Sequence, residues 1–164
     1  MRADSHDFAI RKAAPAERDR LREIFRDAVL AAGPRSYTDQ HVATWAATAD
    51  DVDRWDTRMR EGSTWVAVAP HDAMRAIGVA SLSPQDHVDL LYVDPAFHRR
   101  GIARALLARL EVQAHSARVS ELTTDASLIA HPVFLDAGFE VVAWEEYENR
   151  GQIFRRARMR KVLR

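Results

Sequence analysis

Hydrophobic positions in the first third of the chain recur at helical spacing. Between residues 15 and 32, apolar side chains lie three or four positions apart, and a Gly-Pro pair ends the run. The same spacing follows in a stretch after Thr38 and in another from about Asp50 to Arg60. A short apolar run, Phe8 to Lys12, precedes them and is typical of a strand. We therefore predict one strand followed by three helices.

The period of the pattern changes after Gly62. Three segments rich in β-branched and aromatic residues follow, Ser63–Ala69, Met74–Ser83 and His87–Val93, and short turns containing proline and aspartate separate them. Segments of this length and composition predict three consecutive strands of one sheet.

The longest helical pattern in the chain runs from Arg99 to Arg118, with an apolar stripe that begins at Ile102. We expect a short strand over Glu121–Thr124 after it, and then a helix over Val133–Ala137. Because Pro132 has no N–H to donate, that last helix should start late or be kinked.

The end of the chain predicts a hairpin of two strands, Phe139–Tyr147 and Ile153–Val162, around a turn over Glu148–Gly151. The first strand carries three glutamates, and the second carries four arginines and a lysine. The basic strand alone would suggest RNA binding. Its antiparallel pairing with an acidic strand favours cross-strand ion pairs on a solvated face instead.

The order of these elements indicates the fold class. A strand, helices, three strands, a long helix, a strand, a helix and two strands predict an α/β (α+β) domain with a mixed, largely antiparallel sheet flanked by helices. This order differs from the regular alternation of a doubly wound fold. A chain of 164 residues suits a single domain over residues 1–164 with a sizeable core.

Composition narrows the chemistry. The chain has no cysteine, which excludes disulfides, zinc–thiolate sites, iron–sulfur clusters and a thiol nucleophile. Its 24 lysines and arginines balance 24 aspartates and glutamates, so the surface as a whole does not suit nucleic acid. No apolar run approaches the roughly 20 residues that span a bilayer, and the first ten residues lack the segments of a secretory signal. We expect a soluble cytoplasmic protein that uses no metal.

Candidate chemistry concentrates between His87 and Leu110, where a strand leads through a basic turn into the long helix. The first N–H groups of a helix lack intrahelical partners and lie at the positive end of its dipole. Small residues, Gly101 and Ala103, leave that backbone open, and nearby arginines add positive charge. These arginines are Arg99, Arg100 and Arg104. The turn therefore predicts a site for a pyrophosphate-sized anion, with an ordinary solvated turn as the alternative.

Two patterns in this part of the chain carry a resemblance to a known family. The run L-x-V-x-P-x-x-x-x-x-G-I-A-x-x-L-L-x-x-L extends from Leu91 to Leu110, and Q/R-x-x-G-x-G/A falls on residues 98–103 with His98 at its first position. Residues 127–139 match N-x-x-A-x-x-x-Y-x-x-x-G-F in part. With the order of elements, these patterns resemble the GNAT superfamily of acyl-CoA-dependent N-acetyltransferases over nearly the whole chain.

The resemblance implies a cofactor and a mechanism. Acetyl-CoA would lie in a cleft where the strand ending at Val93 splays from the strand containing Thr123. A primary amine of a small molecule or peptide would attack the thioester directly, and a backbone N–H near Leu91 would stabilise the developing oxyanion. The residues implied at the cofactor site are Leu91, Tyr92, Val93, His98, Arg99, Arg100, Gly101, Ile102, Ala103, Arg104, Ser127 and Phe134.

His87 is the candidate base that removes a proton from the amine. It lies six residues before Val93, where many members of this family place a base. Histidine also titrates closer to neutral pH than any other side chain. Asp89 is two residues further and should project from the same face, where it would orient the imidazole or hold a cationic substrate. The alternative is that both residues are ordinary parts of a strand.

The sequence departs from the family at the tyrosine that often protonates the leaving thiolate. Phe134 stands at that position, and a phenyl ring has no proton to donate. Ser127, Tyr92 and Tyr147 are the candidate substitutes, and water is another. Ser127 stands where the family usually has asparagine, and its hydroxyl would otherwise bond backbone. Phe134 is expected to pack against the cofactor or the core.

The acyl acceptor is less defined than the cofactor. Tyr37, His41, Trp45 and Trp55 lie where the family often forms one wall of the acceptor site, although aromatics at helical spacing are more typical of a core. A non-catalytic acyl-CoA-binding domain is the main alternative function, and an RNA-binding protein is the third. We expect no nucleic acid or membrane partner, and a homodimer is left open.

Overall fold

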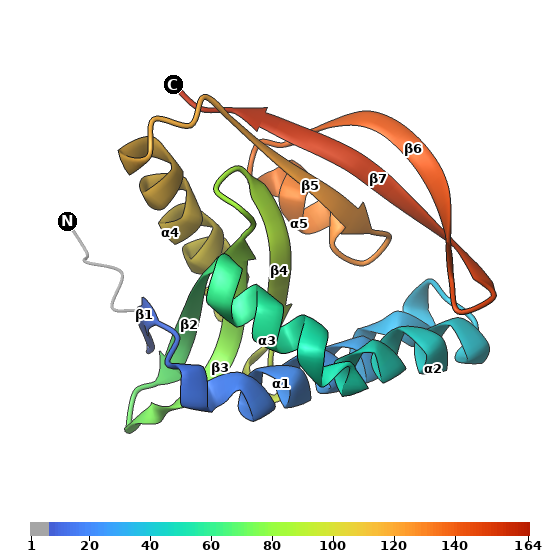
Figure 1. Ribbon diagram of the computed structural model, residues 1–164, viewed down its shortest axis with the longest axis horizontal. Helices are drawn as coiled ribbons and strands as arrows, with labels where there is room; N and C mark the ends of the chain where they lie inside the picture. Colours follow the sequence, from blue (N-terminus) through green and yellow to red (C-terminus); the bar gives the residue numbers. More distant parts are fainter. Residues whose placement is uncertain (1–6) are drawn as a thin grey trace.

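A seven-stranded sheet runs through the part of the chain that the computed structural model describes, residues 7–164 (Figure 1). The strands are β1 (Ala9–Lys12), β2 (Ser63–Ala69), β3 (Asp72–Leu82), β4 (His87–Val93), β5 (Glu121–Ser127), β6 (Glu140–Asn149) and β7 (Gln152–Val162). The helices are α1 (Arg18–Ala32), α2 (Asp39–Ala47), α3 (Val52–Glu61), α4 (Ile102–Ser116) and α5 (His131–Asp136). The expectation about a secretory signal concerns the first ten residues, of which 1–6 lie outside the described residues.

The sheet is mixed and largely antiparallel, which confirms the predicted fold class. Its strand order is β1-β2-β3-β4-β5-β7-β6, and all neighbours are antiparallel except β4 and β5. Within residues 7–164, no helix is both long and apolar enough to cross a membrane.

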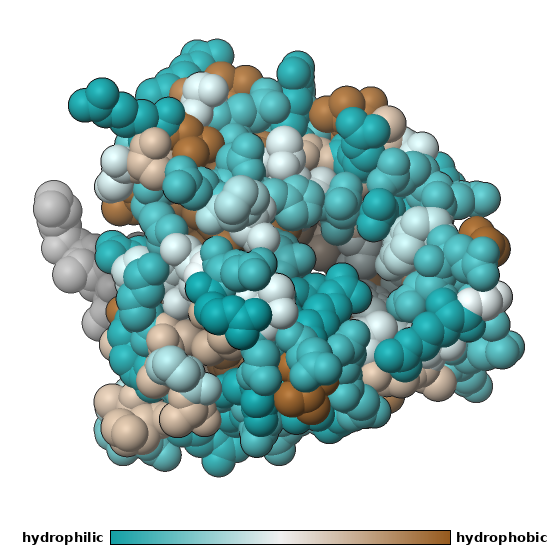
Figure 2. Space-filling view, in the orientation of Figure 1, coloured by the Kyte–Doolittle hydropathy of each residue, from teal (hydrophilic) through white to brown (hydrophobic). Residues whose placement is uncertain are grey.

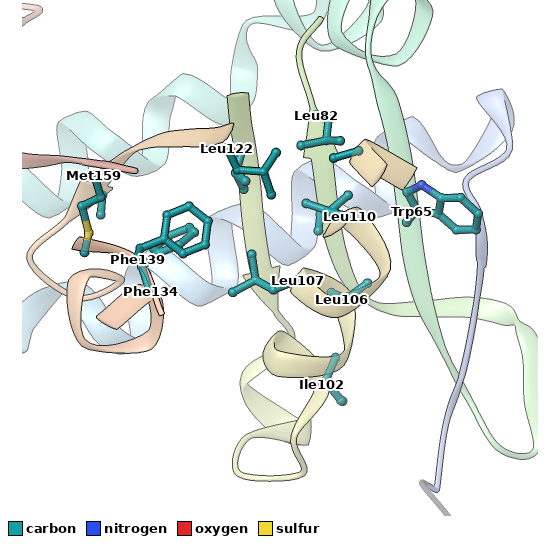
Figure 3. Close-up of a cluster of buried hydrophobic side chains, with 14 of the residues drawn as sticks. Trp65, Leu82, Ile102, Leu106, Leu107, Leu110, Leu122, Phe134, Phe139 and Met159 are labelled. Atoms are coloured by element: carbon teal, nitrogen blue, oxygen red, sulfur yellow. The ribbon is translucent and has the colours of Figure 1, made fainter. Parts of the chain in front are cut away.

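Helices cover the two faces of the sheet and bury two apolar clusters. On one face, α1 to α3 pack against β2, β3 and β4, and Trp55 of α3 is fully buried there. On the other face, the stripe of α4 predicted from the sequence packs with Phe134 and Phe139 against the strands (Figure 3). Because side chains alternate along a strand, Trp65 of β2 faces the second cluster while Val66 faces the first.

The parallel pair β4–β5 is short, and the two strands then separate. Only His87↔Thr123 and Val88↔Thr124 are paired, although both strands continue for several residues. Thr124 closes the paired end by donating its hydroxyl to the Val88 carbonyl at 3.0 Å. Figure 1 shows β5 turning away from β4 beyond this point. The edge of β4 that faces β5 therefore has no strand partner along Leu91–Val93.

The predicted charged hairpin is confirmed by its register. Glu140 lies opposite Arg160 and Glu145 opposite Arg156, with ion pairs of 2.9 and 2.7 Å between them. The turn is shorter than predicted. Arg150 and Gly151 form it alone, with φ of 49° and 82°, and two residues with positive φ match the right-handed twist of a hairpin.

Other predicted boundaries also differ from those in the structure. The long helix begins at Ile102 rather than Arg99, because left-handed backbone at Arg99 (φ 60°) and Gly101 (φ 76°) cannot continue a helix. Strand β5 extends to Ser127, where it pairs with β7. Helix α5 begins at His131, so Pro132 lies in its first turn, where the missing N–H has no helical partner to lose.

Candidate active site

The separation of β4 from β5 opens into a cavity of about 820 Å³. Its walls are the end of β4, the turn before α4, the last turns of α1, and the segment from β5 to α5. Every residue that the sequence placed at the cofactor site lines this cavity except Phe134, which lines a smaller cavity beside it. The structure thus brings those predicted residues together in one place.

The turn before α4 presents backbone N–H groups to this cavity. The first helical backbone bond runs from Ala105 to Gly101, so the amides of residues 102–104 have no partner inside the helix. A β-carbon on Gly101 would meet nothing within 4 Å, and its φ of 76° is the conformation that glycine adopts without strain. Gly101 therefore supplies both the shape of the turn and open space in front of it.

Four arginines line the cavity, and none of them pairs with a carboxylate of residues 7–164. Arg35, Arg99, Arg100 and Arg104 all line it. Within the described part of the chain none of them forms an ion pair with a carboxylate, and Arg100 packs over the Phe97 ring at 5.1 Å. Four cations and the positive end of α4 face one cavity, which favours an anionic ligand with more than one phosphate.

Sequence reasoning missed the wall that α1 contributes. Ala28, Val29 and Ala32 line the cavity from its last turns, and Arg35 follows just after the helix. The Gly-Pro pair before Arg35 indicates by itself only the end of a helix. The small alanines beside a buried Val29 were the one signal in the sequence, because a helix face of small residues leaves room for a ligand.

A glycine on the neighbouring strand brings the N-terminus of α4 close to the sheet. A β-carbon on Gly78 of β3 would lie 2.9 Å from Ile102 Cγ2 and 3.2 Å from Leu106 Cδ1. The first of these contacts is too short for a real β-carbon, so a larger residue at position 78 would push α4 outward. Gly78 therefore helps to set the distance between the N-terminus of α4 and the open edge of β4.

A smaller cavity of about 110 Å³ adjoins the first one, and five residues line both: Trp45, Leu91, Tyr92, Ser127 and Ala130. Its polar lining comes from four strands: Asp89, Asp125, Tyr147 and Arg156. Figure 2 shows a hollow on this side of the molecule between helices α2 and α3 and the β6–β7 hairpin, with mostly hydrophilic residues around it. This cavity is thus a polar pocket beside the open edge of β4.

His87 lies at the closed end of the cleft. Its Nδ1 is hydrogen-bonded to Thr123 Oγ1 at 2.9 Å, and its Nε2 lies 3.7 Å from Asp125 Oδ2. His87 is not among the residues that line either cavity. The hydroxyl that holds the imidazole thus comes from β5, and a carboxylate faces its other nitrogen.

Asp89 lines the smaller cavity but contacts a different partner from the one expected. Its Oδ2 accepts a hydrogen bond from Arg58 Nε of α3 at 2.7 Å. Val88 pairs with Leu82 and Leu90 with Ser81, so Asp89 is an extra residue in β4, a β-bulge. The bulge interrupts the two-residue alternation on which the expectation of a His87–Asp89 contact rested.

The candidates for the missing tyrosine differ in their surroundings. Tyr92 lines both cavities, and burial raises the pKa of its hydroxyl. Burial also raises the pKa of Tyr147. Ser127 Oγ accepts a hydrogen bond from the Ala130 N–H at 3.1 Å, as expected of a hydroxyl that bonds backbone. Phe134 is buried and packs edge-on against Phe139, at 5.0 Å between ring centroids.

The four aromatic residues suggested for an acceptor wall separate into different environments. Trp55 is a core residue, as its spacing favoured, whereas Trp45 lines both cavities. Tyr37 and His41 pack against Phe154 of β7, at 5.8 and 4.9 Å between ring centroids. Part of this aromatic segment is therefore core, and part joins α2 to the β6–β7 hairpin beside the cleft.

Comparisons with known proteins match most of this chain. The family model of the acetyltransferase (GNAT) domain matches residues 34–163. The uncharacterized N-acetyltransferase YafP of Escherichia coli (strain K12) is 35% identical over 156 residues, which cover 94% of this chain and 96% of that protein.

Two solved structures share the fold. A GCN5-related N-acetyltransferase from Rhodopseudomonas palustris superposes with a TM-score of 0.89 at 27% identity, covering 94% of this chain and 95% of that one. The PaiA N-acetyltransferase of Thermoplasma acidophilum, solved with coenzyme A, superposes with a TM-score of 0.75 at 17% identity, covering 94% and 98%.

Proposed function

Since this chain belongs to the GNAT family of acetyl-CoA-dependent N-acetyltransferases, we propose that it acetylates a primary amine of a small molecule or peptide by direct attack in a ternary complex. The observation that carries the proposal is the joined pair of cavities where β4 leaves β5. The larger is lined by four arginines and one carboxylate, so its net charge is positive, as a phosphate-bearing donor requires. The smaller is compact and polar, as an amine requires.

The donor would enter with its pyrophosphate on the amides of residues 102–104 and its pantetheine arm along β4. The unpaired edge of Leu91–Val93 offers backbone groups to that arm, as an added strand would. The four unpaired arginines compensate the phosphate charges. This orientation brings the thioester to the junction of the cavities, beside Leu91 and Tyr92.

The acceptor would then attack from the smaller cavity. The amine nitrogen forms a bond to the thioester carbon, and the carbonyl oxygen gains negative charge that a β4 N–H near Leu91 stabilises. Collapse of this intermediate breaks the carbon–sulfur bond, and the products are the amide and CoA. The nitrogen must lose one proton, and the departing thiolate takes up another.

His87 remains our proposed base. The proposal uses the tautomer in which Nδ1–H donates to Thr123 Oγ1, which leaves Nε2 free to accept a proton, and the resulting imidazolium lies 3.7 Å from the Asp125 carboxylate. That neighbour stabilises the charged product of the transfer. Because His87 does not line the cavity, the proton reaches it through water or through Asp125, which does. Asp89 is already paired with Arg58, so it is less suited than Asp125 to bind the ammonium group of the acceptor.

Tyr92 is the proposed partner of the leaving sulfur. Burial raises the pKa of its hydroxyl, so the group stays protonated throughout the neutral range. A hydroxyl of this kind donates a hydrogen bond to a thiolate without giving up its proton. The final proton for sulfur then comes from water, and Phe134 at the family's tyrosine position needs no substitute acid.

An assay of free CoA over a panel of primary amines tests this function. With acetyl-CoA as donor, we expect thiol release that depends on both the amine and the enzyme, with one N-acetyl product per CoA. Tight CoA binding with no release for any amine would contradict the proposal and favour the non-catalytic alternative. An acetylated enzyme formed before the amine is added would contradict direct attack.

A further inference from the structure

A partly buried ion pair connects α1 to the residue that follows β4, just before the turn into α4. Arg20 Nη2 and Asp94 Oδ2 lie 2.6 Å apart, and Asp94 is only 8% exposed. The two residues are 74 positions apart in the chain. Neither lines either cavity, so neither is placed to contact the ligand.

Asp94 organises the backbone that leads into the turn. Its Oδ1 accepts the Ala96 N–H at 2.9 Å, and its carbonyl accepts the Phe97 N–H at 2.9 Å. Its own N–H donates to the Ile77 carbonyl of β3 at 2.8 Å. The side chain and both backbone groups of one residue thus fix the path of the chain as it leaves β4.

Arg20 fixes the other end of the connection. Besides its contact with Asp94, its Nη1 pairs with Glu23 Oε2 of α1 at 2.8 Å, and its Nε donates to the Ala76 carbonyl of β3 at 2.9 Å. The guanidinium therefore joins α1, β3 and the turn. Since α1 continues to Ala28 and Ala32 in the wall of the larger cavity, the same contact fixes one wall relative to the other.

The turn needs this support because its backbone is strained. Arg99 has a φ of 60°, a left-handed conformation that non-glycine residues rarely adopt. Such a conformation persists when the surrounding structure holds it, and it relaxes when that support is removed. The amides of residues 102–104 directly follow this strained segment, so their direction depends on it.

We propose that Arg20 and Asp94 are positioning residues for CoA, because their ion pair holds the turn in the shape that receives the pyrophosphate. The pair acts on the phosphate end of the donor and leaves the pantetheine end unaffected. This inference rests on the placement of CoA given above, and it does not depend on which amine is acetylated.

The direct test is the CoA affinity of Asp94→Asn, measured by isothermal titration calorimetry without an acceptor. Asparagine keeps the size of the side chain and an oxygen for Ala96, but it loses the charge that holds Arg20. We expect CoA to bind about tenfold more weakly, the scale of a modest misplacement of binding groups. Arg20→Met should have the same effect, and the double variant should be no worse than either single one.

A truncated ligand separates positioning from general damage. Pantetheine lacks the pyrophosphate, so its affinity, followed by ligand-observed NMR, should stay within about twofold of the wild-type value in Asp94→Asn. An equal loss for CoA and pantetheine would overturn the proposal. Unchanged CoA affinity in both Asp94→Asn and Arg20→Met would also overturn it.

Glu17→Gln is the matched control. Glu17 is a similarly buried carboxylate that pairs with Arg11 at 2.7 Å and accepts the Ala14 N–H at 2.7 Å, beside the edge strand β1. Its loss should lower thermal stability and leave CoA affinity unchanged. If the control weakened CoA as much as Asp94→Asn does, loss of stability would explain both results. If Gly101→Glu left CoA affinity unchanged, the placement of CoA would be wrong, separately from the role of the pair.

Discussion

Arginines in two regions of this molecule differ in whether they form ion pairs. In the β6–β7 hairpin, Arg156 and Arg160 face Glu145 and Glu140 in register and form ion pairs with them. At the turn before α4, Arg99 and Arg104 form no ion pair with any carboxylate in residues 7–164. The net charge of the whole chain does not show this difference, because it counts charged residues and not the contacts between them.

The difference teaches which cations are free to bind a ligand. An exposed ion pair adds little stability, usually below about 1 kcal/mol, but it compensates its charges locally. Four arginines and a single carboxylate, Asp136, line the larger cavity, so its excess positive charge is compensated when an anionic ligand arrives. We therefore assign the hairpin arginines to the sheet and the turn arginines to CoA.

The largest expected effect comes from Gly101→Glu. The new side chain would fill the open space at the turn, force a non-glycine residue to φ 76° and place a carboxylate where the pyrophosphate belongs. We expect two hydrogen bonds from backbone amides to the charged pyrophosphate to be lost. Each contributes about 1.5–3 kcal/mol, so CoA affinity should fall at least about 100-fold. Calorimetry measures it.

Gly151→Glu is the control from the other region. Gly151 also has positive φ (82°), and a β-carbon there would likewise meet open space, but it lies at the tip of the hairpin. We expect a lower melting temperature and an unchanged dissociation constant for CoA. Equal losses of CoA affinity in the two variants would remove the distinction between the regions.

His87→Ala tests the point where the two regions meet, since Asp125 lies near both His87 and Arg156. General base catalysis contributes roughly 10²–10⁴-fold, so turnover should fall by about 100-fold while CoA affinity is kept. Full activity in this variant would exclude His87 as the base.

Asp94→Asn should also reduce stability, in a way that depends on pH. Burial alone would raise the pKa of the Asp94 carboxyl, but the Ala96 N–H and Arg20 outweigh it and lower that pKa. The charged form is therefore favoured in the folded state, and its contribution is present above the unfolded pKa of about 4 and lost as the pH falls below it.

At neutral pH this variant should lose about 2 kcal/mol, below the 3–5 kcal/mol of a broken buried pair, because asparagine still accepts the Ala96 N–H. Urea unfolding at several pH values would measure it. The gap between wild type and variant should narrow toward pH 3. If the difference in the free energy of unfolding grew as the pH fell, the ionised Asp94 carboxylate would not be what stabilises the folded state.

The smallest effects come from single arginines. Arg104→Gln should weaken CoA about fivefold, the scale of one exposed charge, and reduce the dependence of binding on salt. Arg160→Gln should leave CoA binding unchanged and cost less than about 1 kcal/mol in stability. Calorimetry at two salt concentrations and thermal unfolding check both. A larger loss of CoA affinity in Arg160→Gln than in Arg104→Gln would contradict the assignment.

The sequence was sufficient where local spacing determines the structure. The strand–turn–helix around Gly101 and the opposed charges of the last hairpin could both be predicted, because each depends on residues close together in the chain. The apolar stripe of α4 likewise predicted the cluster in which Ile102 and Leu110 are buried.

The other features of the site depend on contacts between residues far apart in the chain, which a local sequence pattern does not predict. The bulge at Asp89 directs it to Arg58, and Thr123 of a neighbouring strand holds His87. The Arg20–Asp94 pair joins residues far apart in the chain. The left-handed Arg99 delayed the start of α4 although its residue type favours helix. In each case tertiary structure overrode a sound local expectation.

An NMR titration of the ¹⁵N-labelled protein with CoA tests the central claim most directly, because it follows the backbone amides of both regions at once. We predict the largest shift changes at the amides of Arg99–Arg104 and Leu91–Val93, and no change at the hairpin tip, Glu148–Gln152. Changes centred on that tip, with the turn before α4 unaffected, would contradict the account.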